Sequence, residues 1–120
     1  MRHTLRLNGV IIGHSDLEHA DRGVGRAWGR FRPGFGYDLV QPIFRLFSEA
    51  QPRHGPKDDE KLERYYKARD ALPLELVDPE GVAIATSAIH IADFSEEHEK
   101  TIELDVLIKD EDYWQNRVAN

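Results

Sequence analysis

The sequence predicts an α+β fold in which a three-stranded β unit is present twice, in the order βββ-αα-βββ-α. Residues 9–21, GVIIGHSDLEHAD, match residues 81–93, GVAIATSAIHIAD, at six of thirteen positions. Apolar and polar residues alternate around both segments, which indicates strands, and a helical pattern lies between them. A three-stranded unit is too small to bury its own apolar face. We therefore expect the duplicated units to pair into a six-stranded barrel-like or two-sheet arrangement with the helices packed on it.

The 120 residues are expected to form a single domain made of two pseudo-repeats, about 4–50 and 73–119, joined by a helix at about 56–72. The chain has no cysteine, which excludes disulfides and thiolate metal ligands. No apolar run is long enough for a signal peptide or a membrane span, so we expect no membrane contact and a cytoplasmic location. The net charge of −6 argues mildly against general nucleic-acid binding, without excluding it.

Six strands are predicted from alternation and from turn residues. Asn8-Gly9 is a strong hairpin signal, because both residues tolerate the positive φ of a type I′ turn. Residues 78–81, DPEG, take the same place in the second unit. The predicted strands are 4–7, 10–19, 22–32, 74–76, 82–91 and 101–108.

A change of apolar phase divides the second strand of each unit. Val10 and Ile12 share one face, but the next apolar residue, Leu17, lies on the other. The slip recurs in the strand over 82–91, so we predict a bulge or bend near residues 13–15 and near residues 85–87. Such a bend lets one long strand curl a barrel or serve two sheets.

Three helices are predicted. Pro42 suits the first position of a short helix that is apolar around most of its circumference, so we expect that helix to be deeply buried. The helix at about 56–72 has acidic residues in its first turn and basic residues near its end, which complements the helix dipole. Asp110 is the expected cap of a C-terminal helix, with Tyr113 and Trp114 as its packing residues.

The strand over residues 22–32 carries the first candidate site. Arg26, Trp28, Arg30 and Arg32 alternate onto one face, where arginine offers bidentate donors to phosphate or carboxylate and tryptophan offers a stacking surface. Single-stranded nucleic-acid grooves combine the same two elements. The bland alternative is that the arginines pair across the sheet, or across a dimer, with acidic residues such as those of the strand over 101–108.

Two weaker candidates involve acidic residues and histidine. His14, Asp16 and Glu18, with His19 nearby, are candidate metal ligands, but side chains two residues apart on a strand are about 7 Å apart and cannot enclose an ion alone. The interpretation we favour there is a solvated strand face. The loop over residues 93–100 is expected to be a charged surface turn; the side chains considered there as possible ligands are Asp93, Glu96, Glu97 and His98.

The sequence contains no phosphate loop, no dinucleotide fingerprint, no HExxH and no nucleophile elbow, and it implies no cofactor. We therefore expect a non-catalytic binding or interaction module, acting as a homodimer or on another protein. One alternative is a small enzyme or ligand carrier with a pocket between the two β units, lined by His14, Asp16, Trp28 and His90. A second is a single-stranded nucleic-acid binder that uses the Arg/Trp strand.

Overall fold

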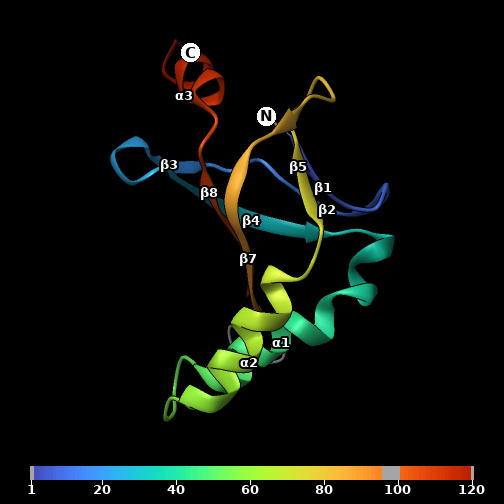
Figure 1. Ribbon diagram of the computed structural model, residues 1–120, viewed down its shortest axis with the longest axis vertical. Coiled ribbons are helices and arrows are strands. Elements are labelled where there is room, and N and C mark those ends of the chain that lie inside the picture. Colours follow the sequence, from blue (N-terminus) through green and yellow to red (C-terminus); the bar gives the residue numbers. More distant parts are fainter. Residues whose placement is uncertain (1, 96–100, 120) are drawn as a thin grey trace.

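The computed structural model describes residues 2–95 and 101–119, in which one antiparallel sheet curls into a nearly closed barrel of seven strands accompanied by three helices (Figure 1). An extra short strand, β3, pairs with β4. The strands are β1 (His3–Leu7), β2 (Val10–Ser15), β3 (His19–Asp21), β4 (Arg26–Pro33), β5 (Leu74–Val77), β6 (Ala83–Ile84), β7 (Thr86–Phe94) and β8 (Thr101–Ile108). The helices are α1 (Gln41–Ala50), α2 (Asp59–Asp70) and α3 (Glu111–Ala119), with 3₁₀ helices η1 (Arg22–Val24) and η2 (Phe35–Leu39).

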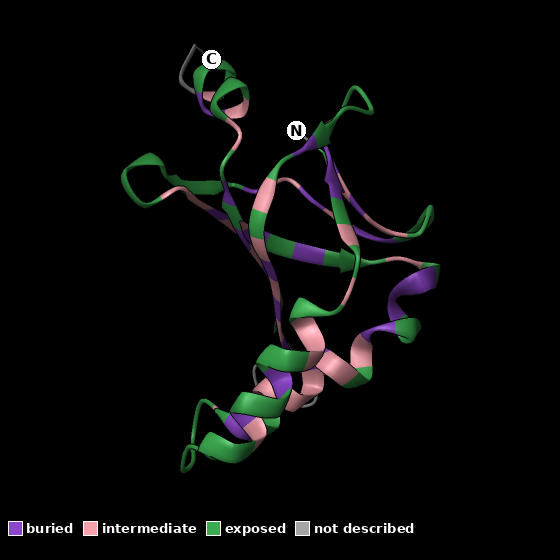
Figure 2. Ribbon diagram, in the orientation of Figure 1, coloured by how far each residue is buried: buried purple, intermediate pink, exposed green. Residues whose placement is uncertain are grey.

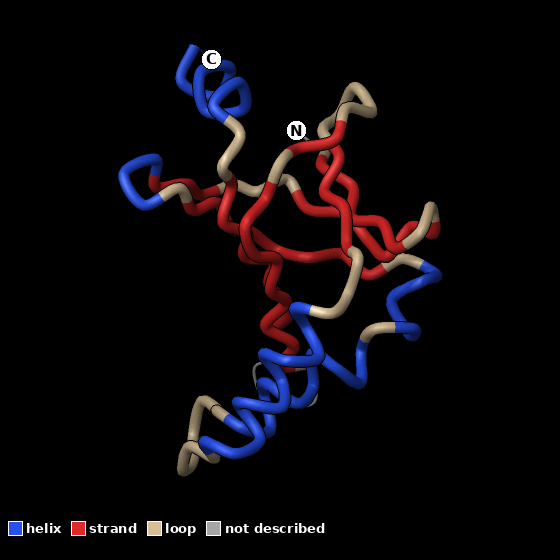
Figure 3. Tube along the Cα trace, in the orientation of Figure 1, coloured by secondary structure: helices blue, strands red, loops and turns tan. Residues whose placement is uncertain are grey.

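The strands follow one another in the order β6-β5-β1-β2-β4-β8-β7. The two end strands, β6 and β7, are consecutive in the chain and only Ala85 separates them, so the sheet curls back on itself (Figure 3). β1 pairs with β5 and β4 pairs with β8, and these two ladders join the first half of the chain to the second. The barrel alternative is therefore confirmed, with more strands than the predicted six because bends divide the long strands.

The barrel interior is filled by aliphatic and aromatic side chains that alternate inward along the strands. Helices α1 and α2 lie together against β7 at one end of the molecule, whereas α3 lies at the other end (Figure 1). The fully or nearly buried side chains of the sheet include Leu5, Ile12, Ala27, Phe31, Leu76, Ile84, Ile89, Ile91, Leu104 and Val106.

Irregularities occur in both predicted bends. In β2, Ile12 is an extra residue, because Leu5 pairs with Gly13 while Arg6 pairs with Ile11. The strand then breaks at Leu17, whose positive φ of 44° is stabilised by a hydrogen bond from its N–H to the Ser15 hydroxyl (3.1 Å). These two points flank the expected range 13–15. In the second half the chain breaks at Ala85 and shifts register between residues 86 and 88, as expected.

The prediction that the third strand begins at residue 22 is wrong. Residues 22–24 form η1, and Gly25 follows it with a left-handed φ of 70°. The Asp21 carboxylate accepts a hydrogen bond from the Gly23 N–H (3.0 Å) and so caps this turn. The strand proper, β4, starts only at Arg26. The Asn8-Gly9 hairpin is confirmed, since both residues have positive φ (49° and 84°).

The three predicted helices are present, but α1 is not deeply buried. Only Phe44 and Ala50 of α1 are buried, and most of its other residues are intermediate (Figure 2), because the helix packs on β7 and α2 from one side only. Helix α2 begins at Asp59, three residues later than expected, where the Asp58 side chain accepts from the Lys61 N–H. In α3, Asp110 accepts from the amides of its first turn, and Trp114 is buried as predicted.

The structure does not confirm the internal duplication, because residues that match in sequence occupy different environments. Gly9 and Gly81 both have positive φ, but Ser15 is fully buried and its counterpart Ser87 is exposed. None of the helices within residues 2–95 and 101–119 has the length and apolarity that crossing a membrane requires.

Candidate functional site

Strand β4 alternates as the sequence predicted. Ala27, Gly29 and Phe31 are buried on the inner face of the barrel. The four candidate residues, Arg26, Trp28, Arg30 and Arg32, project from the other face and are half-buried or exposed. The candidate ligand-binding face therefore exists as a surface, and the question is which of its groups remain available to a ligand.

Arg26 and Trp28 are engaged within the molecule. The Arg26 guanidinium forms a bidentate ion pair with Asp105 of β8, with N–O distances of 2.9 Å (Nε) and 2.7 Å (Nη2). These hydrogen bonds raise the pKa of Arg26 above its usual range. The guanidinium carbon lies 4.1 Å from the centre of the Trp28 ring, and His19 stacks on that ring at 5.5 Å. Arg26 thus pairs with an acidic residue of the neighbouring strand, which is the structural alternative to a ligand site that the sequence left open. The stacking surface of Trp28 is largely occupied.

Arg32 is also paired, whereas the Arg30 side chain is not paired with any described residue. Arg32 forms an ion pair with Asp16 at 3.3 Å, which lowers the pKa of Asp16 through the hydrogen bond from Arg32. The backbone N–H of Arg30 donates to the Glu18 carboxylate (2.9 Å), but its guanidinium has no hydrogen bond or ion pair with any residue that the structure describes. Arg30 is therefore the arginine of this strand that remains available.

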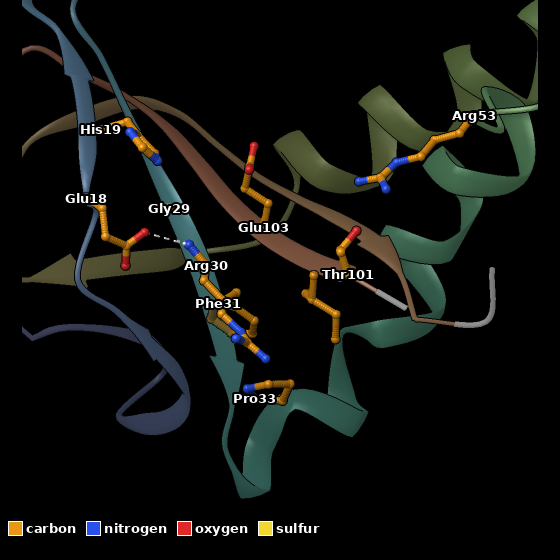
Figure 4. A pocket seen from close by; sticks show the side chains of 10 residues that line it. Glu18, His19, Gly29, Arg30, Phe31, Pro33, Arg53, Thr101 and Glu103 are labelled. Carbon is orange, nitrogen blue, oxygen red and sulfur yellow. Dashed lines mark hydrogen bonds between the residues drawn. The ribbon is translucent and has the colours of Figure 1, made fainter. Parts of the chain in front are cut away.

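Arg30 lies in a cleft of about 570 Å³ between β3, β4, β8 and the α1–α2 connection (Figure 4). Glu103 of β8 is directly opposite Arg30 in the ladder, and Arg53 reaches toward β8 from the other wall. Burial and the neighbouring Asp105 raise the pKa of Glu103. The residues that line the cleft are Glu18, His19, Gly29, Arg30, Phe31, Pro33, Arg53, Thr101, Ile102 and Glu103.

The three metal candidates on the second strand are not brought together. The His14 ring is hydrogen-bonded to Thr4 and to Arg2, Asp16 is paired with Arg32, and Glu18 accepts from the backbone of Arg30. Burial, and then the charges of two nearby arginines, lower the pKa of His14. Within residues 2–95 and 101–119, no three His, Asp or Glu side chains are placed to hold a metal ion.

The predicted pocket between the two β units is not formed by its four expected residues. His90 is largely buried under α1 and α2, where its ring stacks on Phe47 at 4.4 Å and its Nδ1 contacts the Tyr65 hydroxyl. Burial lowers the pKa of His90 to about 4. His14 and Trp28 have the contacts given above, and Asp16 lines a different cleft of about 730 Å³ beside α3, together with Glu80 and Arg117.

The predicted surface turn over residues 93–100 is wrong at its start, because Asp93 and Phe94 belong to β7 and Asp93 is buried. Asp93 is 2% exposed and accepts four hydrogen bonds, from the Tyr37 hydroxyl (2.6 Å), the Gln41 amide (3.1 Å), and the amide and hydroxyl of Ser95. Burial by itself would raise the pKa of Asp93, but these hydrogen bonds outweigh it and lower the pKa. Asp93 is therefore a structural anchor; Glu96, Glu97 and His98 lie outside the described residues.

Sequence reasoning missed a group of exposed apolar side chains, here called the apolar patch: Val10, Ile11, Phe35 and Leu39. Their exposed fractions are 45%, 46%, 106% and 64%. Helix η2 lies directly on β2, so closely that a Cβ at Gly36 would be 2.6 Å from the Ile11 carbonyl oxygen. The signal in the sequence was a phenylalanine between two glycines, a setting that fits neither a strand nor a long helix.

The chain was compared with protein-family models, with curated protein sequences and with solved structures, and none of the three comparisons gave a match. The cleft and the apolar patch are therefore the two features from which we infer a function.

Proposed function

We propose that the chain is a non-catalytic interaction module that self-associates through the apolar patch. The observation that carries the proposal is Phe35, a large aromatic side chain that is fully exposed on η2, the 3₁₀ helix that packs on β2 near the exposed Val10 and Ile11. Contiguous exposed apolar groups on a small protein mark interaction sites, because leaving them in water is unfavourable. The cytoplasmic location expected from the sequence belongs to the same proposal.

The patch is held rigidly. Beneath it, Tyr37 is buried and donates its hydroxyl proton to Asp93, and the Gly34 N–H donates to the Ile12 carbonyl (2.8 Å). Phe35 is therefore exposed because η2 is fixed on β2. A surface ordered before binding loses little conformational entropy when a partner covers it.

A second copy of the chain is the partner that these residues favour. The four side chains of the patch are uncharged, and the Arg6–Glu75 ion pair next to Ile11 in the sheet leaves that border neutral. Asp38 is exposed on η2 between Phe35 and Leu39, so two copies can bring the patch together about a twofold axis only in an arrangement that keeps both Asp38 carboxylates in solvent. The nucleic-acid alternative gains no support, since Arg26 and Arg32 are paired with carboxylates and Trp28 is covered.

Self-association is tested by analytical ultracentrifugation over a wide concentration range. We expect a dimer with a dissociation constant on the order of 10–100 μM, as for a small interface. Phe35→Asp should weaken the dimer at least about tenfold, because a charge would be buried against an apolar surface. A wild-type chain that is monomeric at about 1 mM would refute the proposal.

Val24→Asp is the matched control. Val24 is 65% exposed on η1, outside the patch, and should leave the dimer unchanged. Equal weakening by Val24→Asp and Phe35→Asp would mean that added negative charge, not the patch, controls association. Circular dichroism of each variant establishes that the fold is retained.

A further inference from the structure

The cleft of Figure 4 contains two side chains of opposite charge that are neighbours but not partners. Arg30 and Glu103 are opposite each other in the β4–β8 ladder. Neither side chain forms a hydrogen bond or ion pair with any described residue. Elsewhere on the same two strands Arg26 and Asp105 do pair, at 2.7 Å. On these two strands, the charged side chains form an ion pair outside the cleft, whereas Arg30 and Glu103, which line the cleft, do not pair with each other.

Among the described lining residues other than Arg30 and Glu103, Glu18 and Arg53 carry one charge of each sign. Arg26, His19 and Arg53 lower the pKa of Glu103 that burial has raised, with Arg53 on the far wall, and Glu18 lies next to Arg30 on the near wall (Figure 4). An anion without a positive group would meet the carboxylates of Glu18 and Glu103. A cation without a negative group would meet two arginines. A ligand that carries both charges matches this arrangement, because each of its groups finds an opposite charge.

We propose that this cleft binds a small zwitterion, with the ligand's carboxylate on Arg30 and its ammonium group on Glu103. Arginine is suited to a carboxylate because its planar donors bind both oxygens. Glu103 is partly withdrawn from water and forms no direct ion pair with a described residue, so an ammonium group bound to it supplies a counter-charge in direct contact. The volume of about 570 Å³ lies within the range of small-molecule sites. This site is separate from the apolar patch and does not depend on self-association.

Hydrogen bonds hold the cleft in place before a ligand enters. The Glu18 carboxylate accepts from the Arg30 backbone N–H at 2.9 Å, which fixes β4 relative to the segment that precedes β3. A Cβ at Gly29 would be 2.3 Å from a Glu18 carboxylate oxygen, so glycine lets Glu18 approach this closely. The cleft wall is thus formed by the fold, and binding needs only side-chain adjustment of Arg30 and Glu103.

The test is a titration of the ¹⁵N-labelled full chain with glycine, β-alanine and 4-aminobutyrate, which separate the two charges by increasing distances. Propionate and propylamine, which carry one charge each, are the controls. We expect saturable shifts of the Arg30 side-chain Nε–H and the Glu103 amide, with a dissociation constant of about 1 mM for the best-fitting zwitterion. Each single-charge control should bind at least about tenfold more weakly.

Variants assign the two roles. Arg30→Gln and Glu103→Gln should each weaken zwitterion binding by about tenfold or more, since each removes one opposite charge. The matched controls are Arg64→Gln, on the exposed side of α2, and Glu80→Gln, in the cleft beside α3; both should bind as the wild type does.

Three results would overturn the proposal. Propionate that binds as tightly as the zwitterions would show a simple anion site, and propylamine that does so would show a simple cation site. Shifts that do not saturate at tens of millimolar would show no site at all. Because dimer formation is measured separately, failure here leaves the patch proposal intact, and the reverse also holds.

Discussion

Residues 9–21 and residues 81–93 are alike in sequence, yet their aligned residues differ in burial and in hydrogen bonding. Asp21 is exposed and caps the 3₁₀ helix η1, whereas its counterpart Asp93 is buried and accepts four hydrogen bonds, two of which, from Tyr37 and Gln41, join β7 to η2 and α1. Ser15 is fully buried at the bend of the first segment, whereas Ser87 is exposed. Glu18 and His90 occupy aligned positions and also differ: Glu18 is exposed and lines an open cleft, whereas His90 is half-buried against α1 and α2.

The difference shows that identical residues do not imply equal energetic roles. The two segments share a glycine turn and an irregular strand, which are local properties of the chain. Burial is decided by what packs on each strand, and only the second segment is covered by α1 and α2. The following variants compare aligned positions directly.

The largest effect is expected at the aligned aspartates. Asp93→Ala should destabilise the fold by about 3 kcal/mol, because the Tyr37 hydroxyl and the Gln41 amide would lose their buried acceptor. Asp21→Ala, the matched control, should cost about 1 kcal/mol or less, the usual contribution of an exposed cap. Urea unfolding followed by circular dichroism measures both, and equal losses would contradict the distinct roles assigned to the two residues.

A loss of stability of intermediate size is expected when the pH is lowered, because of His90. Its pKa is about 4 in the folded chain and near 6.5 when unfolded, so the unfolded chain takes up the proton first as the pH falls. The contribution of His90 is therefore complete above about pH 6.5 and is lost progressively toward pH 4, by on the order of 2–3 kcal/mol.

Unfolding free energies measured between pH 7 and pH 4 should show this loss in the wild type and a smaller one in His90→Gln. Gln keeps a polar partner for Tyr65 but does not titrate in this range. An identical pH profile for the two proteins would assign the acid sensitivity to other groups.

The smallest effect is expected where the two segments are equivalent. Gly9 and Gly81 have φ of 84° and 88°, and an added Cβ would contact nothing within 4 Å at either position. Gly9→Ala and Gly81→Ala should therefore each cost about 1 kcal/mol, from the left-handed backbone alone. Thermal unfolding of both variants compares them, and clearly unequal values would mean that the turns differ in more than sequence.

Much of the fold could be predicted because it depends on local patterns. Alternation identified β4 and its outward arginines, Asn8-Gly9 identified the first hairpin, and the phase slip located the break at Ala85. The start of β4 was mistaken because Arg22 and Val24 continue an alternating pattern, while Gly25 in a left-handed conformation ends it. The burial of α1 was overestimated because an apolar composition does not say how many neighbours a helix has.

The candidate site was predicted only as a surface. Which arginine remains available depends on contacts between segments that are apart in sequence, and alternation carries no information on register. Arg26 pairs with Asp105, 79 residues away, and Arg32 with Asp16, 16 residues away, whereas the Arg30 side chain pairs with no described residue. The apolar patch was missed because the exposure of Phe35 follows from the packing of η2 on β2, a contact between short irregular segments.

The two ladders that join the halves of the barrel also bear on how the chain folds during synthesis. β1 pairs with β5 and β4 pairs with β8, and both β5 and β8 are synthesised only after α1 and α2. Until then the first three strands of the barrel have two open edges, and open edges are where strands of different molecules join. The late ladders have high contact order and should set the folding rate. The first half of this chain is therefore most vulnerable to aggregation while the second half is still on the ribosome.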